Sequence, residues 1–224
     1  MKHIAIFSLL AISCSLRAEN QDTTVPDKTL DTFVIGRIGF YTGTGETTYR
    51  YAEVFETYGK WIPLDVYYID FGGAKTYRET AVGGGRTLYD SKQFTMIQEV
   101  YVSQATGPAA HGALYVQPWS YIVYHPNKLL SAEAVYLLYI PVNSAGRVQH
   151  VIERAKVEHD FGHFKLGGGY AAYQFGDGDW QNKPMITTTL KAGKLGSFEF
   201  WLQKMPTHGA QVQVRYAKFF KGHK

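Results

Sequence analysis

The chain has 224 residues, of which 45% are hydrophobic and 19% charged, a composition too apolar for a disordered protein and long enough for one or at most two domains. The 23 Gly, 17 Tyr and 13 Phe, against 4 Met and 8 Pro, favour an all-β fold over a helical bundle or a low-complexity polymer. The formal net charge is +4 and no window contains five like charges, which excludes a nucleic-acid-binding protein with its basic stripe or cluster.

The first eighteen residues have the pattern of a secretory signal peptide. Lys2 and His3 precede the apolar run 4–12, and small residues follow it, with a plausible cleavage point after Ala18. The apolar run is far shorter than the roughly 20 residues of a membrane-spanning helix. No later stretch of that length lacks charge. We therefore predict an exported protein that has lost 1–18 and has no helical anchor.

Cys14 is the single cysteine and lies within the predicted signal. The mature chain is then expected to lack disulfides, thiol nucleophiles and thiolate metal sites. Residues 11–14 also resemble the lipid-attachment site of bacterial lipoproteins, although Ala11 stands where Leu is usual. Loss of Lys2 and Arg17 leaves 21 basic against 19 acidic residues, a net charge of 21 − 19 = +2.

Residues 19–31 are polar and are predicted to form a flexible lead-in, before a single β domain over 32–220 and a tail over 221–224. Turn-forming residues interrupt the β domain eleven times, which predicts twelve strands. The predicted turns lie at 43–45, 59–60, 72–73, 90–91, 107–108, 125–127, 143–146, 160–162, 176–179, 193–196 and 206–209. Each strand with its turn has about sixteen residues, which exceeds the roughly 8–12 of small soluble sandwiches and accommodates bilayer-crossing strands of roughly 9–11. The segment 131–139 contains helix formers, but its β-branched and aromatic residues fit a strand better.

Apolar and polar residues alternate most cleanly in the last four predicted strands, so one face of each strand is apolar and the other polar. In a membrane barrel the polar positions become candidates for lining the lumen. These positions are Lys165, Thr187, Thr189, Lys191, Glu199, Gln203, Gln211, Gln213 and Arg215. Upstream the alternation is blurred, because apolar and charged residues share a face. Tyr49, Tyr51 and Phe55 share one with Glu53, and Ile152 shares one with Arg154 and Lys156.

Two architectures explain this alternation. A soluble barrel or sandwich buries the apolar face, whereas a membrane barrel turns it to lipid. Export without cysteine or anchor favours the membrane barrel. So do the aromatic residues near strand ends, where an interfacial girdle needs them, namely Tyr41, Tyr58, Trp61, Tyr124, Tyr173, Trp180 and Trp201. The odd-numbered connections are also predicted to be longer than the even-numbered ones, in keeping with long external loops and short periplasmic turns.

The last predicted strand, 211–220, resembles the closing strand of bacterial outer-membrane β-barrel proteins, which usually ends in an aromatic residue. Here Phe220 is followed by the further residues 221–224. The resemblance implies a closed antiparallel up-and-down transmembrane β-barrel of about twelve strands, with ten as the alternative, in the bacterial outer membrane. It also implies contact with outer-membrane lipid, recognition of the last strand by the assembly machinery, and a narrow monomeric channel for small solutes.

We therefore predict a passive pore or a structural outer-membrane protein. The alternative is a soluble periplasmic or secreted β-barrel that binds an apolar ligand with its aromatic face inward. For a pore, Lys165, Lys191 and Arg215 outnumber Glu199, which indicates a lumen that favours anions. The competing interpretation is that these cations pair with acids on neighbouring strands and fill the interior.

An enzymatic role is not predicted, and no cofactor is expected. Barrels that resemble outer-membrane phospholipases or deacylases would carry a His followed two residues later by Ser, and no His of this chain has one. His159 and His163 would share a strand face and suggest a metal site, but a hairpin turn between them is the favoured interpretation. The acids in 176–179 suggest calcium, although such a short loop is more often only a loop. Two triple-glycine runs, 83–85 and 167–169, indicate strand bends or close packing.

Overall fold

The computed structural model describes residues 29–44, 47–72, 76–205 and 209–222, so the predicted signal peptide, Cys14 and most of the predicted lead-in lie outside the described residues. The described residues form twelve strands and a short 3₁₀ turn, η1 (Gly193–Leu195). The strands are β1 (Leu30–Tyr41), β2 (Thr47–Tyr58), β3 (Trp61–Phe71), β4 (Tyr77–Asp90), β5 (Phe94–Thr106), β6 (Leu114–Tyr124), β7 (Leu130–Pro141), β8 (Gln149–Asp160), β9 (Phe164–Phe175), β10 (Gln181–Lys191), β11 (Ser197–Lys204) and β12 (Ala210–Phe220). None of the described helical residues belongs to a helix long and apolar enough to cross a membrane.

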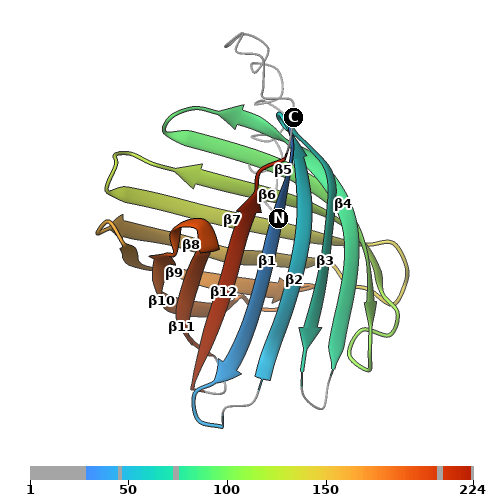
Figure 1. Ribbon diagram of the computed structural model, residues 1–224. Coiled ribbons are helices and arrows are strands. Elements are labelled where there is room, and N and C mark those ends of the chain that lie inside the picture. Colours follow the sequence, from blue (N-terminus) through green and yellow to red (C-terminus); the bar gives the residue numbers. More distant parts are fainter. Residues whose placement is uncertain (1–28, 45–46, 73–75, 206–208, 223–224) are drawn as a thin grey trace.

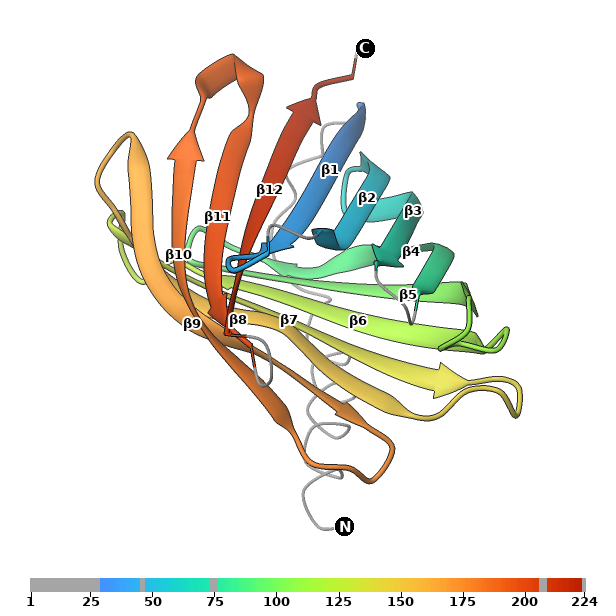
Figure 2. The same ribbon diagram turned by 90° about the horizontal axis from the view of Figure 1, so that it is seen from below.

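The strands close into a single antiparallel barrel in which each strand pairs with its sequence neighbours and β1 pairs with β12 (Figure 1). Closure runs from Thr32 opposite Phe220 to Tyr41 opposite Gln211. In the view from below, β12 lies between β11 and β1, and β6 to β8 form the opposite wall (Figure 2). Closure leaves no unpaired strand edge, as a bilayer requires. The predicted up-and-down β-barrel of twelve strands is confirmed, and the alternative of ten is wrong.

Each of the eleven predicted turns overlaps a connection between strands, and 131–139 lies within β7 as expected. The barrel begins at Leu30, two residues before the predicted start, and β12 ends at Phe220. The odd-numbered connections are 42–46, 72–76, 107–113, 142–148, 176–180 and 205–209, and the even-numbered ones are 59–60, 91–93, 125–129, 161–163 and 192–196. The odd-numbered connections have five to seven residues and gather at one end of the barrel. The even-numbered ones, which we call the short turns, have two to five residues and lie at the other end, together with the start of β1 and the end of β12.

The hairpin predicted between His159 and His163 is also present. The backbone N–H of Phe161 donates to the carbonyl of Phe164 at 2.9 Å, and Gly162 has a φ of 93°, which only glycine adopts readily. Among the described residues, no group of three or more His, Cys, Asp or Glu side chains could hold a metal ion.

The outer surface of the barrel is apolar. Direct cross-strand pairing joins one outward row over seven consecutive strands, which we call the valine belt. It consists of Val34, Val54, Val66, Val82, Val102, Val116 and Ile140. Val102 is 57% exposed, and Ile186 at the centre of β10 is 60% exposed. Soluble monomers rarely expose a continuous apolar surface of this kind, whereas a bilayer requires one.

The predicted aromatic girdle is correct in part. Tyr58, Trp61, Tyr124 and Trp180 are exposed near strand ends. Trp201, however, is 1% exposed and points into the barrel, so its assignment to the girdle is wrong. The alternation in β11 gives the reason, because Trp201 shares the inner face with Glu199 and Gln203. Tyr41 and Tyr173 also face the interior, where they line a cavity.

Candidate functional site

The barrel interior holds two networks of polar side chains with a cavity beside them. The first network, the ionic cluster, gathers four cations and four carboxylates of the described chain from β1, β7, β8, β11 and β12. Its members are Arg37, Glu133, Glu153, Arg154, Lys156, Glu158, Glu199 and Arg215. Because the two signs are equal in number, the cluster as a whole is neutral.

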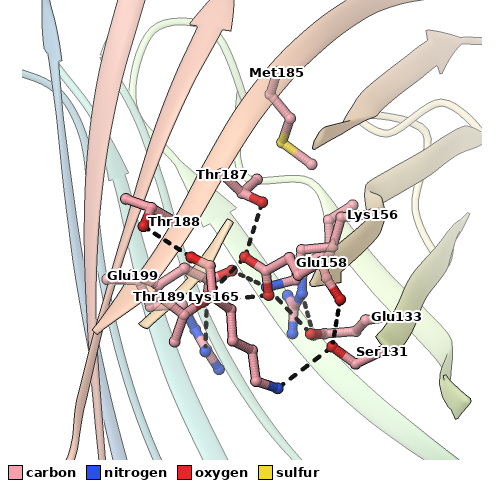
Figure 3. Close-up of polar contacts among 12 residues, drawn as sticks. Ser131, Glu133, Lys156, Glu158, Lys165, Met185, Thr187, Thr188, Thr189 and Glu199 are labelled. Atoms are coloured by element: carbon pink, nitrogen blue, oxygen red, sulfur yellow. Dashed lines mark hydrogen bonds and ion pairs between the residues drawn. The ribbon is translucent and has the colours of Figure 1, made fainter. Parts of the chain in front are cut away.

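Lys156 lies at the centre of the ionic cluster (Figure 3). Its ammonium group is 3.1 Å from Glu158 and 3.5 Å from Glu133, and it also forms an ion pair with Glu199. The Lys156 side chain is 5% exposed, and a charge buried to this degree is stable only when several opposite charges or hydrogen bonds surround it. Thr187 completes the site by donating a hydrogen bond to Glu158 at 2.8 Å.

A β-bulge in β8 builds the other part of the ionic cluster. The register with β9 shifts between Ile152 and Ala155, and that with β7 shifts at the same place, so Glu153 is an extra residue. Glu153 and its neighbour Arg154 consequently both reach inner-face partners. Glu153 pairs with Arg37 across the barrel as well as with Arg154. A bulge re-aims side chains in this way, and it explains why the alternation of β8 is blurred in the sequence.

Arg37 and Arg215 are directly opposite each other in the β1–β12 pair. Like charges in that position repel, and the repulsion is offset because each guanidinium has its own carboxylate, Glu153 for Arg37 and Glu199 for Arg215 at 3.2 Å. The Arg37 guanidinium also lies over the Trp201 ring, 4.4 Å from its centroid, in a favourable cation–π arrangement.

The second network, the tyrosine–carboxyl network, joins β3, β4 and β5, and the Tyr67 hydroxyl connects it to Gln117 on β6 at 2.6 Å. The Tyr67 hydroxyl lies 2.8 Å from Glu79 and the Tyr77 hydroxyl 2.7 Å from the second oxygen of Glu79. The Tyr101 hydroxyl lies 2.7 Å from Asp65 and 3.1 Å from Glu99. Tyr67 and Tyr101 are 1% exposed, so this network fills the interior with aromatic surface, and its phenolic hydroxyls donate to carboxyl oxygens of Asp65, Glu79 and Glu99.

The two triple-glycine runs lie opposite these networks. Gly167 and Gly169 pair with Glu158 and Lys156, and a Cβ atom at Gly167 would lie 1.9 Å from the Val157 carbonyl oxygen. In the other run, Gly83 pairs with Tyr101, and a Cβ there would lie 2.6 Å from the Tyr101 ring. The close packing predicted from the sequence is therefore present, because glycine lets the backbone of β8 approach β9 closely and leaves room for the Tyr101 ring beside β4.

A cavity of about 1330 Å³ occupies the remaining interior. Its lining includes Tyr41 and His111 near the long connections and Gly59 and Thr87 near the short turns, so the cavity reaches both ends of the barrel. Its wall is mainly aromatic and aliphatic. The wall residues include Ile35, Tyr49, Tyr51, Trp119, Tyr121, Val135, Leu137, Tyr139 and Trp201.

The nine lumen candidates from the sequence divide into three groups. Gln203, Gln211, Gln213 and Arg215 line the cavity. Thr187, Thr189 and Glu199 lie in or against the ionic cluster, with the Thr189 hydroxyl 3.1 Å from Glu158. Lys165 and Lys191 lie near the short turns, where Lys165 donates to Ser131 at 3.4 Å and Lys191 pairs with Asp160.

These pairings change the expected charge of the lumen. The prediction of an anion-favouring lumen rests on Lys165, Lys191 and Arg215, but Lys191 and Arg215 each have a carboxylate partner. The competing interpretation, that the cations pair across neighbouring strands, fits the ion pairs that the structure contains. Sequence reasoning did not identify Arg37, Lys156 or the tyrosine wall as interior residues. The available signal was the blurred alternation of β2 and β8, which reflects inner faces that mix aromatic and charged side chains.

No protein-family model matches the chain, and no curated protein matches it in sequence. Solved structures do match its fold. A KdgM porin aligns with a TM-score of 0.55 and 10% identity, and a NanC porin with the same values, each over 85% of this chain and 99% of the porin. The COG4313 outer membrane channel from Pseudomonas putida F1 aligns with a TM-score of 0.56 and 10% identity, over 90% of this chain and 100% of the channel. The chain therefore has the fold of outer-membrane channel proteins, as its resemblance to that class predicts.

Proposed function

We propose that this protein is a passive pore of the bacterial outer membrane that admits small solutes. The observation that carries the proposal is the position of the cavity, which extends to both ends of a closed barrel. A closed barrel with an apolar exterior can reside in a bilayer, and a cavity that reaches both ends provides a route through it. The fold shared with outer-membrane channels supports the same function.

The exterior disfavours the alternative of a soluble apolar-ligand binder. The valine belt and Ile186 would be exposed to water in a soluble barrel, where they would promote association. In an outer membrane they contact lipid. The exposed aromatic residues near strand ends then lie at the membrane–water interfaces, where outer-membrane barrels have aromatic girdles; these residues are Tyr58, Trp61, Tyr124 and Trp180. We infer that β12, which closes the barrel, is the strand that the assembly machinery recognises.

The pore is narrow because side chains fill much of the barrel. The ionic cluster occupies the inner faces of β8 and β11, and the tyrosine–carboxyl network occupies those of β3 to β6. One structural neighbour is a KdgM porin in complex with disordered oligogalacturonate. We do not infer an acidic solute for this pore, because the cations of its ionic cluster are matched by an equal number of carboxylates.

The proposal is tested with the full-length chain. Cells are fractionated, the membrane fraction is run on a detergent gel with and without boiling, and the purified protein is inserted into planar bilayers for single-channel recording. We expect extraction only with detergent, faster migration before boiling, and a stepwise ion current. Urea-denatured protein is the control and should give no current. Folded protein in the soluble periplasmic fraction, or a heat-modifiable barrel without current, would contradict the pore.

A further inference from the structure

The wall shared by β1, β11 and β12 contains an unusual group of polar atoms. Three N–H groups of cavity-lining side chains are buried without a hydrogen-bond partner, namely Nε of Arg37, Nε1 of Trp201 and Nε of Arg215. One acceptor, Oε1 of Gln213, is also buried without a hydrogen-bond partner. Native proteins rarely leave buried polar atoms unpaired, so four such atoms on one wall need an explanation.

These four residues are neighbours on the barrel wall. Trp201 pairs directly with Gln213, and Arg37 pairs directly with Arg215. Gln213 and Arg215 are two residues apart on β12, so both face the interior. We call this group the polar patch. With three donors and one acceptor, it suits a group that chiefly accepts hydrogen bonds and donates one.

The surroundings of the polar patch exclude most other solute chemistries. Tyr49, Tyr51, Tyr121 and Val135 line the same cavity, and such a surface favours an apolar body, aromatic rings in particular. Most interior polar groups already bond to one another, as the Tyr67–Glu79 contact illustrates. A sugar with several hydroxyl groups would leave many of them unpaired, which costs free energy.

Charge is disfavoured in the head group as well. The cations of the polar patch already have carboxylate partners, Glu153 for Arg37 and Glu199 for Arg215. A cationic head group would face the guanidinium groups of Arg37 and Arg215 at the patch itself.

We propose that the polar patch and the aromatic wall form a binding site for uncharged amphipathic aromatic molecules that have a single hydroxyl or carbonyl group. This inference rests on the proposed pore, because it names the class of solute that would pass through it. The aromatic body lies against the tyrosine and tryptophan side chains, and the oxygen of the head group accepts from the N–H groups of the patch while a hydroxyl donates to Gln213.

The test uses four probes with the full-length protein in lipid nanodiscs. 2-Phenylethanol, phenylacetate and phenethylammonium share one aromatic body and differ in charge, and arabinose is a neutral polar comparison. Binding is measured by titrating tryptophan fluorescence, since Trp119 and Trp201 line the cavity. We expect 2-phenylethanol to bind about tenfold more tightly than either charged probe, and arabinose not to bind. Equal or tighter binding of a charged probe or of arabinose overturns the proposal.

Variants then locate the site. Gln213→Leu removes the acceptor of the patch and should weaken 2-phenylethanol binding about fivefold, as expected for one lost hydrogen bond. The matched control is Gln149→Leu, which changes another cavity-lining glutamine, near the long connections, and should leave the affinity unchanged. Equal effects of the two variants would overturn the assignment of the patch.

Single-channel recording separates this inference from the proposed pore. A current through the unliganded protein without any 2-phenylethanol binding would overturn the binding site and leave the pore intact. Binding of 2-phenylethanol by a barrel that carries no current would support the site and overturn the pore. When both are correct, 2-phenylethanol should reduce the mean current in a dose-dependent way, and Gln213→Leu should shift that dose dependence by the same factor as the affinity.

Discussion

Substitution of Lys156 by Met tests whether the ionic cluster stabilises the barrel. Removing one partner of a buried ion pair costs about 3–5 kcal/mol, because it leaves an uncompensated charge. Arg154 still pairs with Glu133 and Arg215 with Glu199, so the uncompensated charge falls mainly on Glu158. Thr187 and Thr189 continue to hydrogen-bond to Glu158. We therefore expect a loss near the lower limit, about 3 kcal/mol.

The assay is reversible urea unfolding of the barrel in lipid vesicles, followed by tryptophan fluorescence and by gel mobility without boiling. Lys191→Met is the matched control, because the Lys191 side chain is 41% exposed and, within the described residues, its ion pair is with Asp160 alone. An exposed pair of this kind contributes about 0–1 kcal/mol. Adding Glu158→Gln to Lys156→Met should restore part of the lost stability by removing the unpaired charge. The reasoning is refuted if Lys156→Met costs no more than Lys191→Met, or if Glu158→Gln restores nothing.

Three further predictions address the exterior, the packing and the charge of the lumen. Ile186→Arg should destabilise the barrel by about 2–4 kcal/mol in vesicles if the centre of β10 lies at the bilayer midplane. Its control, Leu195→Arg in the η1 turn, should leave the free energy of unfolding unchanged. No loss of stability in Ile186→Arg would favour a soluble barrel. Gly167→Val should abolish folding measured by heat-modifiability, because its Cβ would lie 1.9 Å from a backbone oxygen, whereas Gly36→Ala, with nothing within 4 Å, should fold normally. Glu153→Gln should shift the reversal potential in a KCl gradient toward anion selectivity and Arg154→Gln toward cation selectivity; shifts in the same direction would contradict a balanced ionic cluster.

The number of strands and the positions of the turns are predictable from residues close together in the sequence. Turns need residues such as Gly59, with a φ of 60°, and Gly162, with a φ of 93°, and such residues can be recognised one position at a time. The outward faces of β10 to β12 are also predictable, because lipid contact requires apolar residues at every second position. Both constraints act within a few residues along the chain.

The inner faces are less predictable because their constraints act across the barrel. Arg37 pairs with Glu153, which is 116 residues away in sequence, so neither residue carries a local sign of its partner. The bulge at Glu153 breaks the alternation that would mark the inner face of β8. Trp201 looks like a girdle residue in the sequence, but it lies at the middle of β11, and its neighbours on the inner face, Glu199 and Gln203, are buried.

The width of the passage follows from side chains more than from the number of strands. An eight-stranded barrel has an interior just filled by its side chains, so twelve strands enclose more space than short side chains would fill. Here the long side chains of the ionic cluster project from β8 and those of the tyrosine–carboxyl network from β3 to β6, and the cavity is what remains between them. The glycines at 167 and 169 permit this filling, because a Cβ atom there would lie 1.9 Å from the Val157 carbonyl oxygen and 2.1 Å from the Ala155 carbonyl oxygen and would push away the strand that carries Lys156 and Glu158. Since the ionic cluster is neutral, filling the barrel in this way narrows the passage without giving it a strong charge. Selection of solutes then falls to the aromatic wall and the polar patch.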